Sequence, residues 1–271
     1  MESQTPPELP TTTNEPIPTE TVEVVGENEE EQIQTISIPD DTPMVVIPGG
    51  PFEMGSDADP LEQPIHTVTL DEFQIDQFEV TNARYALCVE AAVCDPPADV
   101  SSSTLENYFD NPEYGEYPVI YVNWNQAKRY CEWREGRLPT EAEWEKAARG
   151  TDERTYPWGD DFDGTRLNFC DTNCPYGLIN DEFDDGHSDT APVGSYPEGV
   201  SPYEVHDMAG NVWEWVHDGL GERYYASSPA ENPPGPANAA WKIIRGGSWS
   251  GTLEKVRTTE RQTEEGRARL R

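Results

Sequence analysis

The sequence has few positive charges. It carries 18 Lys and Arg against 53 Asp and Glu, which gives a formal net charge of −35. A surface of that sign repels phosphate backbones and anionic lipids, so we expect no nucleic-acid partner. No apolar run approaches the roughly 18–20 residues of a membrane span, and the N-terminus lacks a basic, then apolar, then small-residue signal. We therefore expect no membrane insertion within this sequence.

Residues 1–43 lack every aromatic, cysteine, lysine and arginine, and they hold eleven acidic residues and seven prolines. Such a segment cannot bury enough apolar surface to offset its ordering entropy. We predict a disordered, acidic, Pro-rich linker over 1–43 and one folded domain over 44–271. The 8 Trp, 12 Tyr and 7 Phe, all beyond residue 43, indicate that this domain has a sizeable core.

Regular structure is predicted only in the first half of the domain. Met44–Ile47 is a short apolar strand before Pro48, and the alternation over Ile65–Leu70 is typical of a half-buried strand. His66 therefore fits an exposed or hydrogen-bonded strand residue better than a metal ligand. From residue 151 onward Gly, Pro, Asp and Asn recur every few residues, which predicts irregular structure.

Three helices are predicted from their capping signals. Thr81 is an N-cap for a helix over 82–92. Two capping boxes, Asn123 with Gln126 and Thr140 with Glu143, begin helices over 124–135 and 141–149. Gly136 and Gly150 occupy the places where left-handed C-terminal residues belong.

Five cysteines are present, and no two have the CxxC spacing typical of zinc sites. The separations allow two local disulfides, Cys88 with Cys94 and Cys170 with Cys174, which would imply an oxidising compartment. Cys131 lies within a predicted helix, where we expect a buried, inert thiol.

A series of short motifs runs through residues 44–271 in a fixed order. These are Ile47-Pro48-Gly49-Gly50 with Met54-Gly55, Glu79-Val80-Thr81-Asn82, Asn123-Trp124, Arg137-Leu138-Pro139-Thr140-Glu141-Ala142-Glu143-Trp144-Glu145, Tyr156-Pro157-Trp158-Gly159, Thr190-Ala191-Pro192-Val193-Gly194, Gly210-Asn211-Val212-Trp213-Glu214-Trp215 and Arg245-Gly246-Gly247-Ser248-Trp249. Their order resembles the formylglycine-generating enzyme, or sulfatase-modifying factor, family. The resemblance implies a single compact α+β domain, related to C-type lectins, with little regular secondary structure.

Catalytic members of that family oxidise a protein cysteine to formylglycine with O₂ and a copper(I) ion held by two cysteines. Soft Cu(I) requires soft sulfur ligands. The matching positions here are Gly251 and Val256, and no cysteine follows Cys174. We therefore assign no catalytic residue and expect no copper.

The resemblance also implies two structural calcium sites. One would use the side chains of Asp207 and Glu214 with carbonyls of the Gly210–Val212 region. The other would use the side chains of Asn168 and Asp185 with the carbonyls of Phe169 and His187. Calcium accepts such mixed oxygen ligands. The alternative is that these acids cap turns or are solvated. The full set of expected ligands is Asn168, Phe169, Asp185, His187, Asp207, Gly210, Val212 and Glu214.

The family's substrate groove maps to Arg245, Ser248 and Trp249, with Trp249 the best candidate for an exposed contact. Ion-paired arginine is the alternative for Arg245, and core packing is favoured for Trp133 and Trp144. Ser248 has no His or Asp partner at a recognisable spacing, so a nucleophilic role is not expected.

Two functions remain. The preferred one is a non-oxidase, calcium-stabilised binding or signalling module of the cell envelope or extracytoplasmic space, monomeric, with an unidentified peptide, glycan or protein ligand. The alternative is a formylglycine-generating homologue with altered chemistry. Family members close with a Gly-Phe-Arg strand, and this sequence stops before it, so we expect a chain that lacks that last strand.

Overall fold

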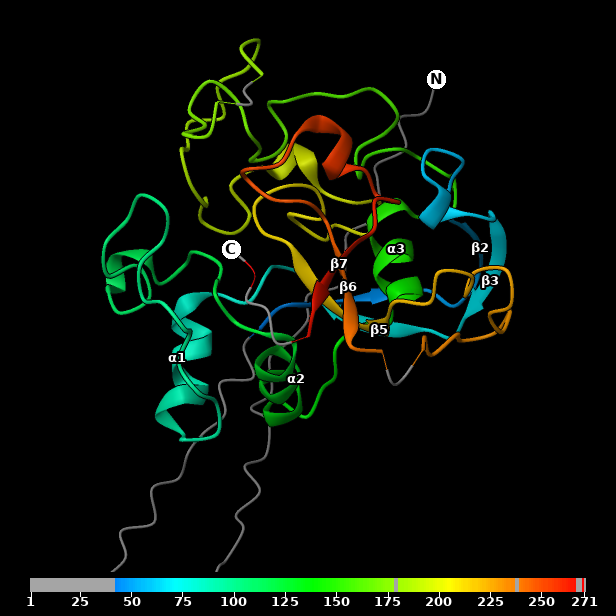
Figure 1. Cartoon of the computed structure of the whole chain (residues 1–271), viewed down its shortest axis with the longest axis horizontal. Helices are drawn as coiled ribbons and strands as arrows, with labels where there is room; N and C mark the ends of the chain where they lie inside the picture. The colour runs from blue at the N-terminus through cyan, green and yellow to red at the C-terminus, as the bar shows by residue number, and fades with distance from the viewer. Residues whose placement is uncertain (1–41, 178–179, 237–238, 267–269, 271) are drawn as a thin grey trace, which may run out of the picture. The chain divides into compact units, whose positions relative to one another are not determined.

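The computed structural model describes residues 42–177, 180–236, 239–266 and 270. The predicted linker therefore lies outside the described residues, apart from Thr42 and Pro43. The described part contains three α-helices, α1 (Asn82–Glu90), α2 (Trp124–Trp133) and α3 (Glu141–Arg149), and four short 3₁₀ turns at Pro60–Glu62, Pro112–Tyr114, Pro197–Gly199 and Leu253–Val256 (Figure 1).

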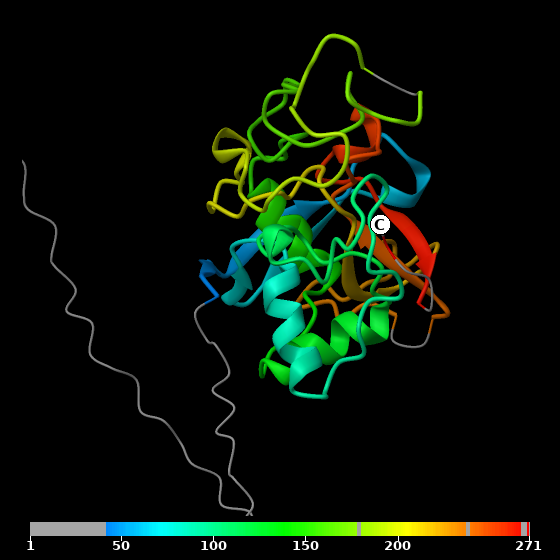
Figure 2. The ribbon, with the colours of Figure 1, turned by 90° about the vertical axis from the view of Figure 1, so that its left-hand side faces the viewer.

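Seven short strands form three small antiparallel sheets within the described residues. One pairs β1 (Met44–Ile47) with β4 (Phe73–Asp76), and a second pairs β2 (Gly50–Met54) with β3 (His66–Leu70). The third has the order β5 (Glu214–Gly219), β6 (Trp241–Arg245), β7 (Gln262–Glu265). Long loops connect these elements in Figure 2. The predicted α+β class with little regular structure is confirmed.

The capping signals predicted where the helices begin. The Thr81 hydroxyl accepts the Arg84 amide at 3.3 Å, and both capping boxes are present. The predicted ends of α1 and α2 are each two residues too long. After α2 the left-handed residue is Glu135 (φ 60°), not Gly136, whose amide instead donates to the Cys131 carbonyl at 2.8 Å. Gly150 has the positive φ of 71° that favours glycine, but its ψ of −139° lies outside the predicted left-handed helical conformation.

Helix α3 lies at the centre of the core, and all nine of its residues are buried. Trp144 is fully buried and clusters with apolar side chains from β1, β5 and β6, namely Ile47, Val216 and Ile243. Figure 1 shows α3 surrounded by the sheets. The predicted core role of Trp144 is confirmed.

Burying α3 on every side also buries its charged residues. Glu145 accepts a hydrogen bond from the fully buried Arg245 at 2.6 Å, and Glu141 accepts from Arg245 at 3.3 Å and from Arg261 at 2.7 Å. Lys146 donates to the Pro48 carbonyl at 2.7 Å. Glu141, Glu145 and Lys146 are thus matched by partners from distant parts of the chain, whereas Glu143 pairs with the nearby Arg137 at 2.6 Å.

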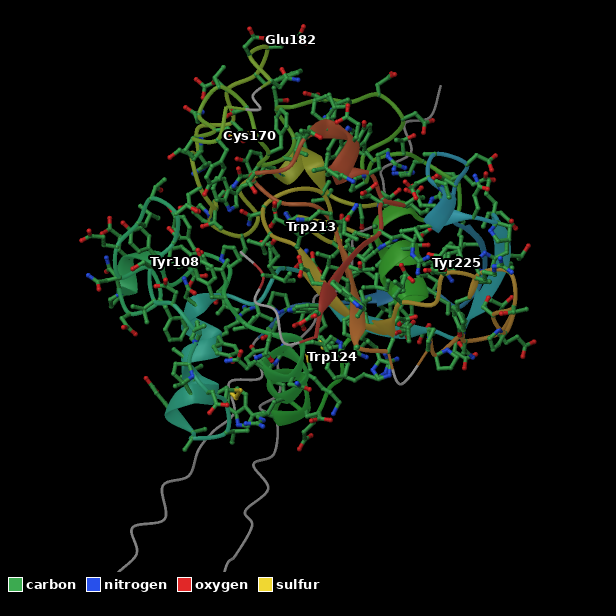
Figure 3. All side chains as sticks on the ribbon, viewed as in Figure 1. Tyr108, Trp124, Cys170, Glu182, Trp213 and Tyr225 are labelled. Atoms are coloured by element: carbon green, nitrogen blue, oxygen red, sulfur yellow. A yellow bond between two sulfur atoms is a disulfide. The ribbon has the colours of Figure 1, made fainter. Side chains whose placement is uncertain are left out.

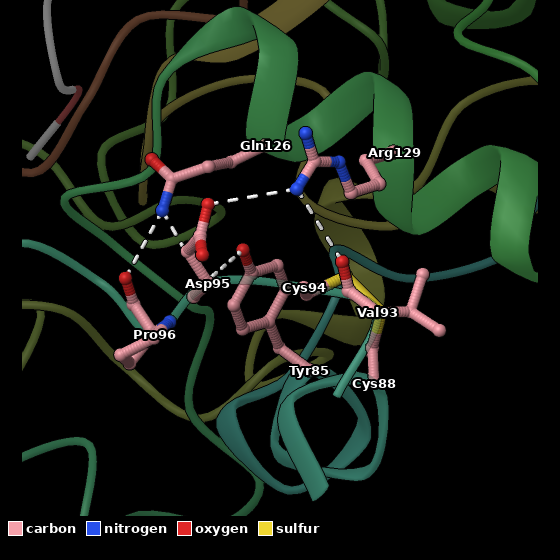
Figure 4. Close-up of a disulfide and its surroundings, with 8 residues drawn as sticks. All are labelled: Tyr85, Cys88, Val93, Cys94, Asp95, Pro96, Gln126 and Arg129. Carbon is pink, nitrogen blue, oxygen red and sulfur yellow. Dashed lines mark hydrogen bonds and ion pairs between the residues drawn. A yellow bond between two sulfur atoms is a disulfide. The ribbon is translucent and has the colours of Figure 1, made fainter. Parts of the chain in front are cut away.

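Both predicted disulfides are present, with Cα–Cα distances of 5.2 Å for Cys88–Cys94 and 4.9 Å for Cys170–Cys174. Figure 4 shows the first, at the end of α1. Beside it Arg129 of α2 lies 3.5 Å from the carboxylate of Asp95, so the disulfide turn is also held to α2. Among the described residues, no helix is long and apolar enough to cross a membrane.

We predict that Arg245→Met destabilises the domain by about 3–5 kcal/mol, because it leaves the buried carboxylates of Glu141 and Glu145 short of their partner. Arg129→Met, which removes an exposed ion pair with Asp95, should cost less than about 1 kcal/mol. Urea unfolding of both variants measures the difference. Equal losses in the two variants would contradict a special role for the buried pair.

Candidate functional site

Three carboxylates, those of Asp207, Glu214 and Glu79, lie in one buried region. Glu79 precedes α1, Asp207 lies in a loop with left-handed backbone at φ 55°, and Glu214 begins β5. The Gly194 amide donates to Asp207 at 2.6 Å, and the Trp144 indole donates to Glu214 at 3.0 Å. The described residues provide no lysine or arginine in an ion pair with any of the three carboxylates.

Burial makes the charged forms of these acids costly. It raises the pKa of Asp207 to about 6 and that of Glu214 to about 7. Burial, together with the negative charges of Asp207 and Glu214, raises the pKa of Glu79 well above its ordinary value. A cation bound beside these three acids would therefore favour their charged forms.

A glycine shapes the loop between Asp207 and Glu214. Gly210 has φ 83°, and a Cβ there would lie 2.2 Å from the carbonyl oxygen of Asn168. Its neighbour Asn211 donates through its side-chain amide to Glu79 at 2.6 Å. The side-chain oxygen of Asn211 accepts from the Asn168 amide at 3.1 Å, which connects this cluster to a second one.

The second cluster surrounds Asp185. Its carboxylate accepts from the Phe169 amide at 3.0 Å and from the His187 amide at 2.8 Å, so three of the four expected ligand residues lie together. Burial raises the pKa of Asp185 to about 7. The fully buried Asp171 also belongs here, because its carboxylate accepts the Asp185 amide.

The fourth expected ligand, Asn168, has a side-chain oxygen that is free to accept a further bond. Its amide nitrogen donates to the Asp189 carbonyl at 2.9 Å and to Asn211, which fixes the orientation of the side chain. Its side-chain oxygen is buried and has no hydrogen-bond partner. A buried oxygen without a donor costs free energy that a metal ligand bond removes.

The residues of both clusters fit calcium better than a transition metal. No group of three or more His, Cys, Asp and Glu side chains in the described part of the chain has the geometry to hold a metal ion by itself. Carbonyl and amide oxygens would have to complete either site, which is the mixed oxygen set that calcium accepts.

Gly251 and Val256 stand at the two positions where the family resemblance would place copper ligands. Val256 is fully buried and packs with Tyr156, Leu167 and Phe169. The Gly251 carbonyl accepts the Cys170 amide at 2.9 Å, so the loop closed by the Cys170–Cys174 disulfide lies against this position. Figure 3 labels Cys170 within that loop.

The groove residues expected from the sequence do not lie at the surface. Arg245, Ser248 and Trp249 are 0%, 2% and 3% exposed. The prediction that Trp249 forms an exposed contact is wrong, because the Tyr176 ring packs 5.5 Å from it. Tyr176 is 51% exposed and is the aromatic residue that solvent reaches here. Arg245 forms ion pairs with the buried Glu141 and Glu145 of α3, which is the alternative that the sequence offered for it.

His66 and Cys131 agree with their predicted roles. The Nδ1 atom of His66 lies 2.9 Å from the Pro64 carbonyl, which makes it a hydrogen-bonded strand residue. Cys131 is a free thiol that is partly buried rather than fully buried, and burial raises its pKa to about 12, as expected for an inert cysteine.

Comparison with known proteins places the chain in a family. Residues 30–270 match the model of the sulfatase-modifying factor enzyme 1-like domain. The chain is 38% identical over 251 residues to the formylglycine-generating enzyme of Streptomyces coelicolor, covering 76% of this chain and 78% of that protein. It is 32% identical to the inactive C-alpha-formylglycine-generating enzyme 2 of Bos taurus, with 78% and 77% covered.

A serine/threonine-protein kinase pkn1 of Chlamydia pneumoniae is 35% identical over 88% of this chain, but the match spans only 37% of the kinase. The solved structure of PvdO from Pseudomonas aeruginosa superposes with a TM-score of 0.66 at 27% identity, covering 84% of this chain and 90% of that one. The chain therefore belongs to the sulfatase-modifying factor family and shares its fold.

Sequence reasoning missed Glu79 and Asp171 as members of the two clusters. Glu79 was visible as part of the Glu79-Val80-Thr81-Asn82 motif, but only folding brings it to Asp207, 128 residues away in the sequence. Asp171 lies between the cysteines of the second disulfide, which was the only signal in the sequence that its position is fixed.

We predict that the free energy of unfolding of Glu214→Gln increases relative to that of the wild type as the pH rises from 5 to 7.5 in EDTA. A carboxyl whose folded pKa is raised holds its proton longer in the folded state, so its contribution to stability is lost as the pH rises through about 7. Glutamine resembles the protonated form, and the gain over wild type should reach roughly 3 kcal/mol at the upper end.

Urea unfolding at each pH measures this difference, with the exposed Glu106→Gln as control. Burial lowers the pKa of His187, His206 and His217, so these histidines make the folded state more stable as the pH rises. Their contribution is the same in variant and wild type and cancels in the difference. A pH-independent difference for Glu214→Gln would show that this carboxyl has no raised pKa.

Proposed function

We propose that this chain is a calcium-stabilised, non-oxidase module that binds a partner or serves in signalling. The observation that carries the proposal is the pair Gly251 and Val256, which replaces both copper ligands of the catalytic family members. Val256 fills a packed apolar cluster, and Gly251 supports the disulfide loop through its carbonyl. Neither residue offers a sulfur ligand for Cu(I).

Two relatives make a non-oxidase role plausible. One carries the name inactive C-alpha-formylglycine-generating enzyme 2. The other is a serine/threonine-protein kinase in which the matching region is a part of a longer chain. The ligand we propose is a peptide, glycan or protein, bound by a monomeric domain. The two disulfides favour an extracytoplasmic or cell-envelope location.

Calcium, when bound, would supply positive charge and fix loops that no sheet or helix holds. In the first site Asp207 and Glu214, with Glu79 beside them, would provide the carboxylates, and the carbonyls of Gly210 and Val212 would complete the oxygen set. In the second site Asn168 and Asp185 would provide side-chain oxygens, and the carbonyls of Phe169 and His187 would contribute the rest. The buried, unpartnered Asn168 oxygen supports this assignment.

We predict that excess Ca²⁺ raises the melting temperature over that in EDTA, because a ligand that binds only the folded state stabilises it, by about 2.7 kcal/mol at 100 times its Kd. In calorimetric titration with Ca²⁺, Asp207→Asn and Asp185→Asn should each remove one of two binding sites, and the double variant should remove both. The exposed Asp57→Asn is the matched control. An EDTA-insensitive melting temperature in the wild type would remove calcium from the proposal.

The alternative function is an oxidase with altered chemistry, and one assay separates the two. We predict that the chain, supplied with Cu(I) and O₂, forms no aldehyde on a Cys-x-Pro-x-Arg peptide, because no pair of thiolates is available beside Gly251. The formylglycine-generating enzyme of Streptomyces coelicolor is the positive control. Turnover by this chain at a rate comparable with the control would establish the alternative.

A further inference from the structure

A small cavity lies beside the first turn of α3. Strand β3 contributes His66 to its lining, α3 contributes Glu141 and β5 contributes Asp218. The loop that follows β5 contributes Tyr225 and Ser228. The cavity gives the centre of a water-sized sphere about 10 Å³ of room, which is enough for one water molecule. It can therefore hold a single ligand of that size.

The loop that carries Tyr225 and Ser228 is bonded to β3. The Thr69 amide donates to the Ala230 carbonyl at 2.7 Å, and the Asn232 amide donates to the Thr69 carbonyl at 2.9 Å. Figure 3 labels Tyr225 in this part of the molecule. The side chains that the loop places at the cavity therefore have fixed neighbours.

The hydroxyl of Tyr225 is buried at this cavity without a hydrogen bond. Tyr225 is 4% exposed, and its ring lies 4.7 Å from the His66 ring and 4.2 Å from the guanidinium carbon of Arg261. No described residue bonds to the hydroxyl. Burial raises the pKa of Tyr225 well above its ordinary value, so the hydroxyl keeps a proton that needs an acceptor.

Two further atoms at the same cavity are in the same position. The Nε2 atom of His66 and the Oγ atom of Ser228 are buried and have no hydrogen-bond partner among the described residues. Eight such side-chain atoms occur in the described part of the chain, and three of them belong to residues that line this one cavity. Each costs free energy unless a partner satisfies it, so their convergence indicates a shared ligand.

The cavity also provides hydrogen-bond acceptors. The Nδ1 atom of His66 lies 2.9 Å from the Pro64 carbonyl, which can only accept, so the neutral ring carries its proton on Nδ1 and Nε2 accepts. Asp218 is 3% exposed, and its carboxylate accepts the Glu141 amide at 2.8 Å. Burial raises the pKa of Asp218 to about 7, and a carboxyl group has acceptor capacity beyond one bond in either protonation state.

We propose that this cavity binds one structural water, which accepts hydrogen bonds from the hydroxyls of Tyr225 and Ser228 and donates to His66 Nε2 and the Asp218 carboxylate. Two donors and two acceptors match the two lone pairs and two protons of a water molecule, within the two to four bonds that buried waters make. The water ties the loop to β3 and β5 beside the first turn of α3.

Neither an anion nor a cation fits this lining as well. An anion would face the carboxylates of Glu141 and Asp218. A cation would take the oxygen lone pairs and leave the hydroxyl protons of Tyr225 and Ser228 unbonded. Calcium and magnesium also require about six or more ligands, mostly oxygens, which exceeds the two hydroxyls and the carboxylate of Asp218.

A crystal structure of the 271-residue chain tests the site directly. We expect one density peak at about 2.7–3.2 Å from the four named polar groups, and no anomalous signal there after a soak in a rubidium salt. Rubidium at the site, or contacts well below about 2.7 Å in a sodium salt, would assign a monovalent cation and overturn the proposal. The absence of any peak within hydrogen-bond distance of the Tyr225 hydroxyl would overturn it as well.

A double-mutant cycle tests the shared water in solution. Tyr225→Phe and Ser228→Ala each remove one hydroxyl, and these hydroxyls do not bond to each other. If one water joins them, the double variant loses less stability in urea unfolding than the sum of the single losses. The matched control pairs Tyr225→Phe with Ser227→Ala, an exposed neighbour whose hydroxyl bonds to backbone carbonyls of its own loop, and these losses should add. Additive losses in both pairs would refute the shared water.

Discussion

The pairing of Arg245 with Glu145 and Glu141 is the constraint on which the rest of the domain depends. Helix α3 is buried on all sides, so its charged residues have no access to solvent. A buried carboxylate without a partner would cost several kcal/mol. Arg245 on β6 and Arg261 just before β7 supply the partners, so the C-terminal sheet must reach α3 before the helix can be buried. These buried ion pairs allow a few short strands to pack around a single helix, although no long sheet holds the strands together.

The local part of this fold was readable from the sequence. Capping boxes at Asn123 and Thr140 fixed the beginnings of α2 and α3, because the bonds they make span three residues. The end of α2 was harder to predict. Gly136 adopts a left-handed conformation more easily than Glu135, yet Glu135 is the residue that adopts it. Disulfides that close short loops were equally accessible, because the distance between their cysteines is limited by the chain itself.

The long-range part was not readable. Whether Arg245 and Trp249 face a groove or the core depends on where α3 and Tyr176 lie, and nothing near residue 245 in the sequence contains that information. The same reason explains why Glu79 was missed beside Asp207. Phe169, Asp185 and His187, which the family resemblance named as one set, do lie together, because the order of motifs carries three-dimensional information that periodicity and spacing lack.

The side chain of Asn211 has a consequence for communication between the two carboxylate clusters. The amide nitrogen of Asn211 donates to Glu79, and its oxygen accepts from Asn168, whose own side-chain oxygen is buried and has no hydrogen-bond partner. Any event that rotates this amide must disturb both ends together. The positions of the Glu79 carboxylate and of the Asn168 side chain are therefore coupled through this single amide.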